Sequence, residues 1–347
     1  MEPLTEREYL ILDAVIRSYV ETAEPAGSRS VVRRFNLGLS PATVRNTMSD
    51  LEEKGYLYHP HTSAGRVPTD RAYRVFVDSI IGQPRTAPDE ARSLRQELES
   101  AGERSAVETL IRHAAQVLGL LTQELGIAVA PRLDEAVLDR LELIAIADGK
   151  ILLILALRAG GVRTIYVDVP GDLPPATLAA VGQVLNNRLA GLTLRDIRAT
   201  LRSRLRDSAP AGEAVTSELL NVFLQSAEDW FGDLPGTEAV HLGSAAMLAE
   251  QPEFNSGERL RHLIELTERR DLLRTVLGDR IGSSGLQITI GGEHGDPVLA
   301  GFTVVTSEYR VRNLRGVIGV IGPTRMPYDR IIALVESTST LVSEFLE

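Results

Sequence analysis

The fold of this chain is decided by residues 27–68, which read GSRSVVRRFNLGLSPATVRNTMSDLEEKGYLYHPHTSAGRVP. The pattern predicts a short helix that ends near Phe35, with Ser28 as its N-cap, followed by a turn at residues 36–39. A second helix opens at Ser40-Pro41, because serine caps free N–H groups and proline loses nothing at the first helical position. The stretch therefore predicts a helix-turn-helix.

The second helix has two unlike faces. Val44, Met48 and Leu51 recur at i, i+4 and i+7 and form a stripe that we expect to be buried. The opposite face is polar, and a recognition helix reads DNA base edges with such a face, Asn pairing with adenine and Arg with guanine. The predicted DNA-contacting residues of the two helices are Ser28, Arg29, Ser40, Ala42, Thr43, Arg45, Asn46 and Ser49.

Charge is unevenly distributed. Residues 27–49 contain four arginines and no carboxylate, although the chain of 347 residues carries a formal net charge of -10. An acidic protein binds polyanions poorly through its overall field, so any nucleic-acid affinity has to come from this local patch. The alternative is that the arginines form the solvated face of ordinary helices.

A hairpin is predicted directly after these helices. Residues 57–59 and 66–68 read as short strands around a glycine-bounded loop at 61–65, and no carboxylate occurs between Lys54 and Asp70. Such a wing can lie along a phosphate backbone or insert an arginine into a minor groove. Its predicted DNA-contacting residues are His61, Thr62, Ser63 and Arg66.

Several runs of residues resemble one protein family. The N-terminal runs are Leu4–Arg7, Ile11-Leu12, Glu24–Ser28 and Leu39–Asn46, then Pro60–Thr69 with Tyr73-Arg74. The C-terminal runs are Pro252–Asn255 and Gly316–Met326. In this order the runs resemble the HrcA family of heat-inducible transcription repressors.

The resemblance implies a function and its control. It implies a homodimeric repressor that binds double-stranded DNA at the CIRCE inverted repeat upstream of chaperone operons. A dimer suits such a site, because one recognition helix reads only a few base pairs. The resemblance also implies that the GroEL chaperonin helps the repressor reach its active fold, so that repression lapses when heat diverts the chaperonin to other clients.

The predicted class is α+β multidomain. The prediction includes an N-terminal winged helix-turn-helix and, from the resemblance, a GAF-like α/β domain interrupted by an inserted α/β dimerisation domain. Three strands at 141–147, 151–157 and 162–169 are expected to form an antiparallel meander inside the insert. The predicted segments are the winged helix-turn-helix at 1–81, a linker and helix at 82–104, the GAF-like domain at 105–132 and 235–347, and the insert at 133–234.

Further elements follow from local signals. Thr5 and Glu8 form a capping box, and Thr69 is expected to cap the helix that follows the hairpin. The first helix is predicted to bury Tyr9, Leu12, Ile16 and Tyr19. In the GAF-like domain we expect strands at 127–130, 240–242, 286–290, 301–306 and 317–321, and a closing helix at 327–345.

Composition excludes several classes of protein. The chain is 44% hydrophobic and 24% charged and has no cysteine, so a disulfide framework is excluded. A charged N-terminus predicts no signal peptide, and charges interrupt the most apolar stretch, 141–157, so no membrane span is predicted. We therefore expect a cytoplasmic protein.

Catalytic and cofactor motifs are missing from the sequence. The glycine runs at 290–292 and 319–325 lack the context of a phosphate-binding loop and read as strand ends and turns. His59 and His61 have no cysteine or carboxylate close by in sequence, so we predict no metal site, and we assign no catalytic residue and no cofactor. Residues 293–296 read as a polar hairpin tip. Two alternatives stay open, a metabolite-responsive regulator with a ligand in the GAF-like domain and an enzyme with a DNA-binding head.

Overall fold

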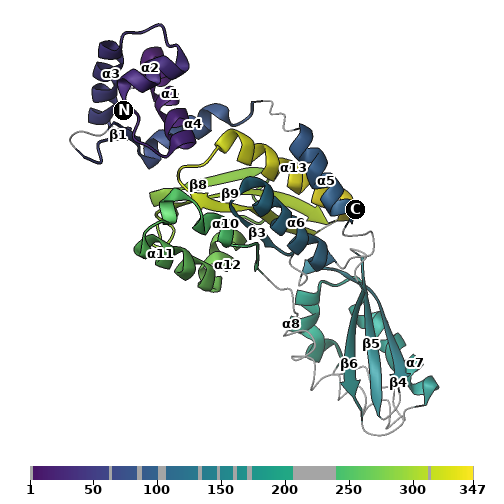
Figure 1. The fold of residues 1–347 in the computed structure, drawn as a ribbon. Coiled ribbons are helices and arrows are strands. Elements are labelled where there is room, and N and C mark those ends of the chain that lie inside the picture. Colours follow the sequence, from purple (N-terminus) through teal and green to yellow (C-terminus); the bar gives the residue numbers. More distant parts are fainter. Residues whose placement is uncertain are drawn as a thin grey trace. The chain divides into compact units, whose positions relative to one another are not determined.

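The computed structural model describes residues 3–61, 65–83, 88–100, 107–131, 135–146, 149–158, 162–169, 174–205, 240–311 and 314–346. They mix helices with several separate sheets, which confirms the α+β class (Figure 1). Unit 1 consists of Met1–Val129, Val240–Tyr309 and Val317–Phe345, and unit 2 of Ala130–Ala239, Arg310–Gly316 and Leu346–Glu347. Among the described helices, none is both long and apolar enough to cross a membrane.

The N-terminal part of unit 1, residues 3–83, is called the head below. It has four helices and a two-stranded antiparallel sheet around a core of aliphatic side chains from all four helices. Its elements are α1 (Glu6–Thr22), α2 (Ser28–Phe35), α3 (Pro41–Glu53), β1 (Leu57–Tyr58), β2 (Val67–Pro68) and α4 (Asp70–Ile80).

Three helices of the head begin where their capping residues predict. The Thr5 side chain accepts from the Glu8 amide and the Glu8 carboxylate accepts from the Thr5 amide, which confirms the capping box of α1. Ser40 Oγ accepts from the amide of Thr43 at 3.1 Å to cap α3, and Thr69 caps α4. Each cap satisfies amides that have no partner within the helix.

The remaining local predictions for the head need two corrections. Gly27, not Ser28, is the N-cap of α2, and Ser28 lies inside the helix, buried and without a capping hydrogen bond. In α1 the prediction of buried Leu12 and Ile16 is confirmed, but Tyr9 and Tyr19 are only half-buried. The reason is tertiary, because α1 packs against α2, α3 and α4 with the side that carries Ile11, Leu12 and Val15.

The predicted hairpin is confirmed, and it is tied to the segment before α2. Leu57 pairs with Pro68 and Tyr58 with Val67, while Ala26 exchanges two backbone hydrogen bonds of 2.8 and 2.9 Å with Arg66. A Cβ on Gly65 would lie 2.5 Å from the backbone oxygen of Pro25, so only glycine allows this close approach.

A five-stranded sheet with order β7-β3-β10-β9-β8 forms the rest of unit 1, and we call it, with its helices, the sheet domain. The predicted strands are confirmed, but β9 and β10 run further than expected. Buried Tyr309 and Val311 lie in the extension of β9, and buried Leu314 lies in that of β10. Its strands are β3 (Leu125–Val129), β7 (Val240–Leu242), β8 (Leu286–Ile290), β9 (Phe302–Val311) and β10 (Leu314–Pro323). Its helices are α5 (Pro88–Ser100), α6 (Val107–Thr122), α10 (Ala246–Ala249), η2 (Pro252–Phe254), α11 (Gly257–Glu268), α12 (Arg270–Gly278), η3 (Gly291–His294) and α13 (Tyr328–Leu346).

Helices cover both faces of this sheet. Leu263 of α11 and Leu273 of α12 pack with Ile127 and Val304 in one apolar cluster, and α6 and α13 lie on the other side (Figure 1). On that other side Ser339 of α13 donates to Ser307 of β9 at 2.9 Å. The three inner strands β3, β10 and β9 are therefore nearly all buried on both faces, whereas the edge strands β7 and β8 are mostly half-buried.

Unit 2 contains a three-stranded antiparallel sheet of order β4-β5-β6, which confirms the predicted meander. One face of the sheet is buried against α7, where the Asn186 side chain forms hydrogen bonds of 2.8 and 2.7 Å with the backbone of Leu141. The elements are β4 (Leu138–Ile146), β5 (Lys150–Leu157), β6 (Val162–Asp168), α7 (Pro175–Leu189) and α8 (Leu194–Leu205).

Candidate nucleic-acid interface

Helix α3 buries one face and exposes the other. Val44, Met48 and Leu51 are buried in the head, which confirms the predicted stripe. The opposite face exposes Ser40 at the N-cap and the side chains of Ala42, Arg45, Asn46 and Ser49, with Thr43 half-buried beside them. We call these six residues the α3 face.

The α3 face is pre-ordered at its N-terminal end. Ser40 Oγ lies 2.9 Å from Thr43 Oγ1 as well as accepting from the Thr43 amide, so both hydroxyls are held by the cap. Arg45 and Asn46 follow within the first two turns and point away from the buried stripe. These positions suit contacts with base edges, since recognition helices use the residues near their N-terminus.

Basic side chains surround this face. Arg29 and Arg33 of α2 and Arg45 of α3 are exposed, and no ion pair within the described part of the chain involves any of the three. Arg34 is different, because it forms an ion pair with Glu21 of α1. Three of the four arginines in the predicted basic segment are therefore available to phosphate oxygens.

The hairpin is less basic than its sequence suggests. Arg66 is largely buried and forms an ion pair with Glu52 of α3 at 2.8 Å, and His59 Nδ1 lies 2.7 Å from the same carboxylate. Lys54 forms an ion pair with Glu8 of α1 at 2.7 Å. The hairpin itself contains no carboxylate, as its sequence shows, but α1 and α3 supply acids to its cations.

The Glu8 carboxylate is held more tightly than that of Glu52. Its hydrogen bond from Lys54, together with the one from the Thr5 amide, lowers its pKa from 4.5 to about 2. The carboxylate is buried and accepts three hydrogen bonds, so its charged form is strongly favoured. Lys54 is thereby held against α1 as a half-buried side chain.

The other predicted DNA-contacting residues differ in their exposure. Ser28 is buried and lies away from the exposed face, whereas His61 is exposed. Thr62 and Ser63 lie outside the described residues. No group of three metal-ligating side chains occurs among the residues that the structure describes, and His59 faces Glu52 instead of His61.

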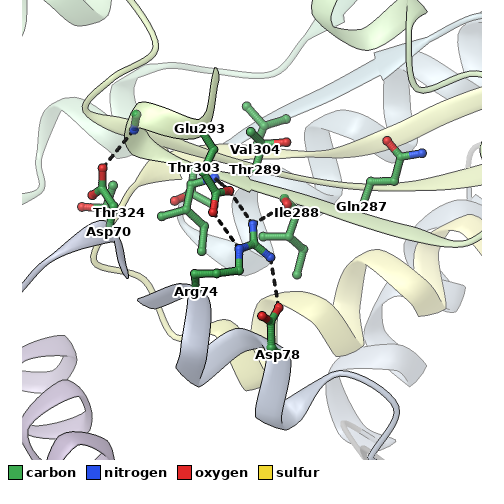
Figure 2. A network of polar contacts seen from close by, with 12 residues as sticks. Asp70, Arg74, Asp78, Gln287, Ile288, Thr289, Glu293, Thr303, Val304 and Thr324 are labelled. Carbon is green, nitrogen blue, oxygen red and sulfur yellow. Dashed lines mark hydrogen bonds and ion pairs between the residues drawn. The ribbon is translucent and has the colours of Figure 1, made fainter. Parts of the chain in front are cut away.

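Helix α4 joins the head to η3 of the sheet domain through a polar network (Figure 2). Arg74 Nε donates to Glu293 at 2.7 Å, and the same guanidinium donates to the Ile288 carbonyl at 2.7 Å and to Asp78 at 3.3 Å. Asp70 accepts from the Gly292 amide at 2.9 Å. Residues 293–296 lie between the antiparallel strands β8 and β9, as predicted for a polar hairpin tip, and Glu293 in addition anchors the head.

A second junction joins the two C-terminal motifs, Pro252–Asn255 and Gly316–Met326, to the head. Arg325 forms a two-pronged ion pair with Glu253 and donates to the carbonyl of Val20 at 2.6 Å, near the end of α1. The hydrogen bonds from Arg325 to Glu253 raise the pKa of the Arg325 guanidinium above its ordinary value. Sequence reasoning noted both motifs but missed this pairing, since 72 residues separate Glu253 from Arg325.

The glycine run at 290–292 follows the end of β8, as predicted, whereas most of the run at 319–325 lies within β10, and both runs serve close packing. Gly291 follows β8 with φ of 50°, and a Cβ there would lie 2.1 Å from the Asp70 carboxylate. A Cβ on Gly322 would lie 2.3 Å from the carboxylate of Glu124, a buried group whose pKa is raised well above 4.5 by desolvation. Both glycines leave room for carboxylates of the protein itself.

Known proteins match this chain along nearly its whole length. The family profile described as HrcA protein C terminal domain matches residues 108–332. Three curated relatives carry the name heat-inducible transcription repressor HrcA. They come from Chlorobium phaeobacteroides strain BS1 (37% identity, 99% of this chain, 98% of the relative), Geobacter sulfurreducens (36%, 100% and 99%) and Roseiflexus castenholzii (35%, 99% and 94%).

A solved structure shares the fold. It is titled a crystal structure of a hypothetical protein at 2.2 Å resolution and is 22% identical to this chain. The TM-score is 0.64, and the alignment covers 99% of both chains. The likeness therefore extends over all the segments described above.

Proposed function

This chain belongs to the HrcA family of heat-inducible transcription repressors, and from that membership we propose that it represses chaperone operons by binding the CIRCE inverted repeat as a homodimer. The relatives are named as transcription repressors and not as enzymes, which supports a regulator without catalysis. In this proposal residues 1–81 are a winged helix-turn-helix, and the sheet domain is GAF-like, interrupted by a dimerising insert at 133–234.

The exposed α3 face is the observation that best supports DNA binding. Helix α3 combines a buried apolar stripe with this exposed polar face. Arg29, Arg33 and Arg45, on and around the face, form no ion pair among the described residues. We propose that Arg45 and Asn46 contact bases and that Arg29 and Arg33 contact phosphates. Ser28, being buried, is expected to support α2 without touching DNA.

The sheet of unit 2 supports dimerisation. Ile144, Leu152 and Tyr166 are register partners across β4, β5 and β6, on the face opposite to α7. Tyr166 is 70% exposed and Ile144 is 45% exposed, and Val162 on the same face is 69% exposed. A contiguous apolar face of this kind favours burial against a partner, and we propose a second copy of this chain.

The proposal includes control by the GroEL chaperonin, which rests on family membership. A repressor whose folded fraction depends on a chaperonin loses activity when the chaperonin is occupied, because a change of about 1–2 kcal/mol in stability shifts populations several-fold. Heat would thereby relieve repression without any ligand.

Fluorescence anisotropy tests the DNA target. The purified full-length protein is titrated onto a CIRCE duplex and onto a duplex with one scrambled half-site, at fixed salt, with and without GroEL. We expect preference for the intact repeat and a larger active fraction with GroEL. Equal affinity of folded protein for both duplexes would contradict the proposed operator.

Sedimentation velocity tests the dimer. Tyr166→Asp places a charge in the middle of the exposed sheet face and should shift the protein from dimer to monomer. Leu120→Asp is a matched control, because Leu120 of α6 is 60% exposed and belongs to unit 1. A Tyr166→Asp variant that remains dimeric would show that the dimer uses another surface.

A further inference from the structure

A cavity of about 480 Å³ lies in unit 1 between the head and the sheet domain. Tyr19 of α1, Tyr58 of β1 and Tyr73 of α4 line it from the head, and Arg259 and His262 of α11 line it from the sheet domain. Cavities of roughly 300–1,000 Å³ accept small organic molecules. The volume is thus sufficient for a metabolite-sized ligand.

One wall of the cavity carries a buried hydroxyl without a partner. Tyr73 is only 2% exposed, and its hydroxyl makes no hydrogen bond with any described residue. Leaving a buried hydroxyl unpaired is unfavourable, so a ligand whose acceptor reached this hydroxyl would gain a hydrogen bond from it.

Among the described lining residues, Arg259 is the charged side chain that no carboxylate neutralises. Within the described part of the chain, Arg259 donates only to the backbone carbonyl of Glu253, at a long 3.4 Å, and His262 lies one turn further along α11. The carboxylates of the wall are occupied, since Glu253 is paired with Arg325 and Asp70 accepts from the Gly292 amide. The groups free to meet a ligand are therefore donors, which select an anionic ligand.

The remaining lining is aromatic. Phe254 and Phe302 stack with ring centroids 5.9 Å apart, and both line the cavity together with Tyr19 and Tyr58. Aromatic rings favour a planar apolar body through stacking. We propose that this cavity binds a small organic anion with a planar apolar body, its charged end held by Arg259 and the Tyr73 hydroxyl.

Such a ligand would contact α4 and α11 at the same time. It would favour the arrangement in which the Arg325 and Arg74 junctions are closed, because a ligand shifts a conformational equilibrium toward the state that it binds better. The inference goes beyond repression and does not depend on the DNA target, since its test measures binding to the protein alone.

Isothermal titration calorimetry of the full chain with 2-naphthoate tests the site, and the neutral isostere 2-naphthamide serves as the reference compound. We expect naphthoate to bind about tenfold more tightly than the amide. Arg259→Gln should remove this preference. Arg261→Gln, which changes an exposed residue of the same helix outside the cavity, should keep it.

Tyr73→Phe separates ligand binding from structure. Without the probe, this variant should be as thermally stable as the parent protein, because the lost hydroxyl has no protein partner. Its affinity for naphthoate should fall several-fold. If the variant is unstable, Arg259→Gln still decides the question, because Arg259 is exposed and makes no ion pair among the described residues.

Three outcomes would overturn the proposal. The first is no detectable heat of binding at millimolar naphthoate, which would mean that the cavity holds only water. The second is equal affinity for naphthoate and naphthamide. The third is an unchanged preference in Arg259→Gln, which would place the probe elsewhere on the protein.

Discussion

The α3 face and the β1–β2 hairpin adjoin each other in sequence and both look basic there, but their cations have different surroundings. On α2 and α3, Arg29, Arg33 and Arg45 form no ion pair among the described residues. In the hairpin region, Arg66 is paired with Glu52 and Lys54 with Glu8. A count of charges along the sequence was therefore adequate for one region and misleading for the other.

The two regions differ because their side chains contact neighbours at different separations along the sequence. The polar face of a helix borders its own residues at i+3 and i+4, so Arg29, Arg33 and Arg45 meet no acid at these spacings, although Arg34 reaches Glu21 of α1. The hairpin packs beside α1 and α3, and Glu8 is 46 residues from Lys54. In this protein α3 is suited to reading DNA, while the cations of the hairpin also hold the head together.

The largest effect should come from the α3 face. Asn46→Ala removes an exposed side chain that we expect to pair with a base, and should weaken operator binding by about 1–3 kcal/mol and relax preference at one position of each half-site. Anisotropy titrations on operator variants measure both effects.

Asn187→Ala is the matched control, since Asn187 is exposed on α7 of unit 2. Circular dichroism verifies that both variants are folded. Unchanged operator affinity in folded Asn46→Ala would remove Asn46 from the reading surface and weaken the contrast between the two regions.

The next effect concerns the structural role of Lys54. Glu8→Gln removes a charged hydrogen-bond acceptor and should destabilise the protein by about 1–2 kcal/mol at pH 7. The folded pKa of Glu8 is about 2, below its ordinary 4.5, so its stabilisation is complete above about pH 4.5 and is lost as the pH falls toward 2. The difference between the parent protein and the variant should shrink at pH 3.

Urea unfolding followed by far-ultraviolet circular dichroism measures this difference at pH 7 and pH 3. Glu6→Gln is the control, because Glu6 is exposed in the first turn of the same helix. A difference that stays constant between the two pH values would show that the Glu8 charge does not stabilise the head.

The smallest effect should come from removing the ion pair between Arg66 of the hairpin and Glu52. Glu52→Gln removes the partner of Arg66 and His59 and should strengthen binding to operator and scrambled DNA alike, by less than about 1 kcal/mol. The slope of log affinity against log salt should become steeper by up to about 1.

Glu53→Gln makes the same change of charge at the next residue, which is exposed and has no ion pair among the described residues. Anisotropy at several salt concentrations compares the two variants. Equal effects of both substitutions would mean that only net charge matters and that the Glu52 pair does not restrain Arg66.

Local signals predicted most elements correctly. Thr5, Ser40 and Thr69 cap helices as expected, and β7 and β8 have the predicted limits. Ser28 failed as a cap because Gly27 occupies the N-cap position, leaving Ser28 inside the helix and buried. Capping is decided within a few residues, whereas the burial of Ser28 depends on the rest of the head.

The sequence by itself determined the helix-turn-helix pattern, the hairpin and the meander, because their periods, caps and turns act over a few residues. It also predicted which side chains of α3 are exposed, and these are the residues that we propose to read DNA. Only the tertiary structure decided which cations remain free, that Arg325 pairs with Glu253, and that Glu293 anchors α4. Ion pairs and cavities depend on which distant segments meet, and that is decided by packing of the whole fold.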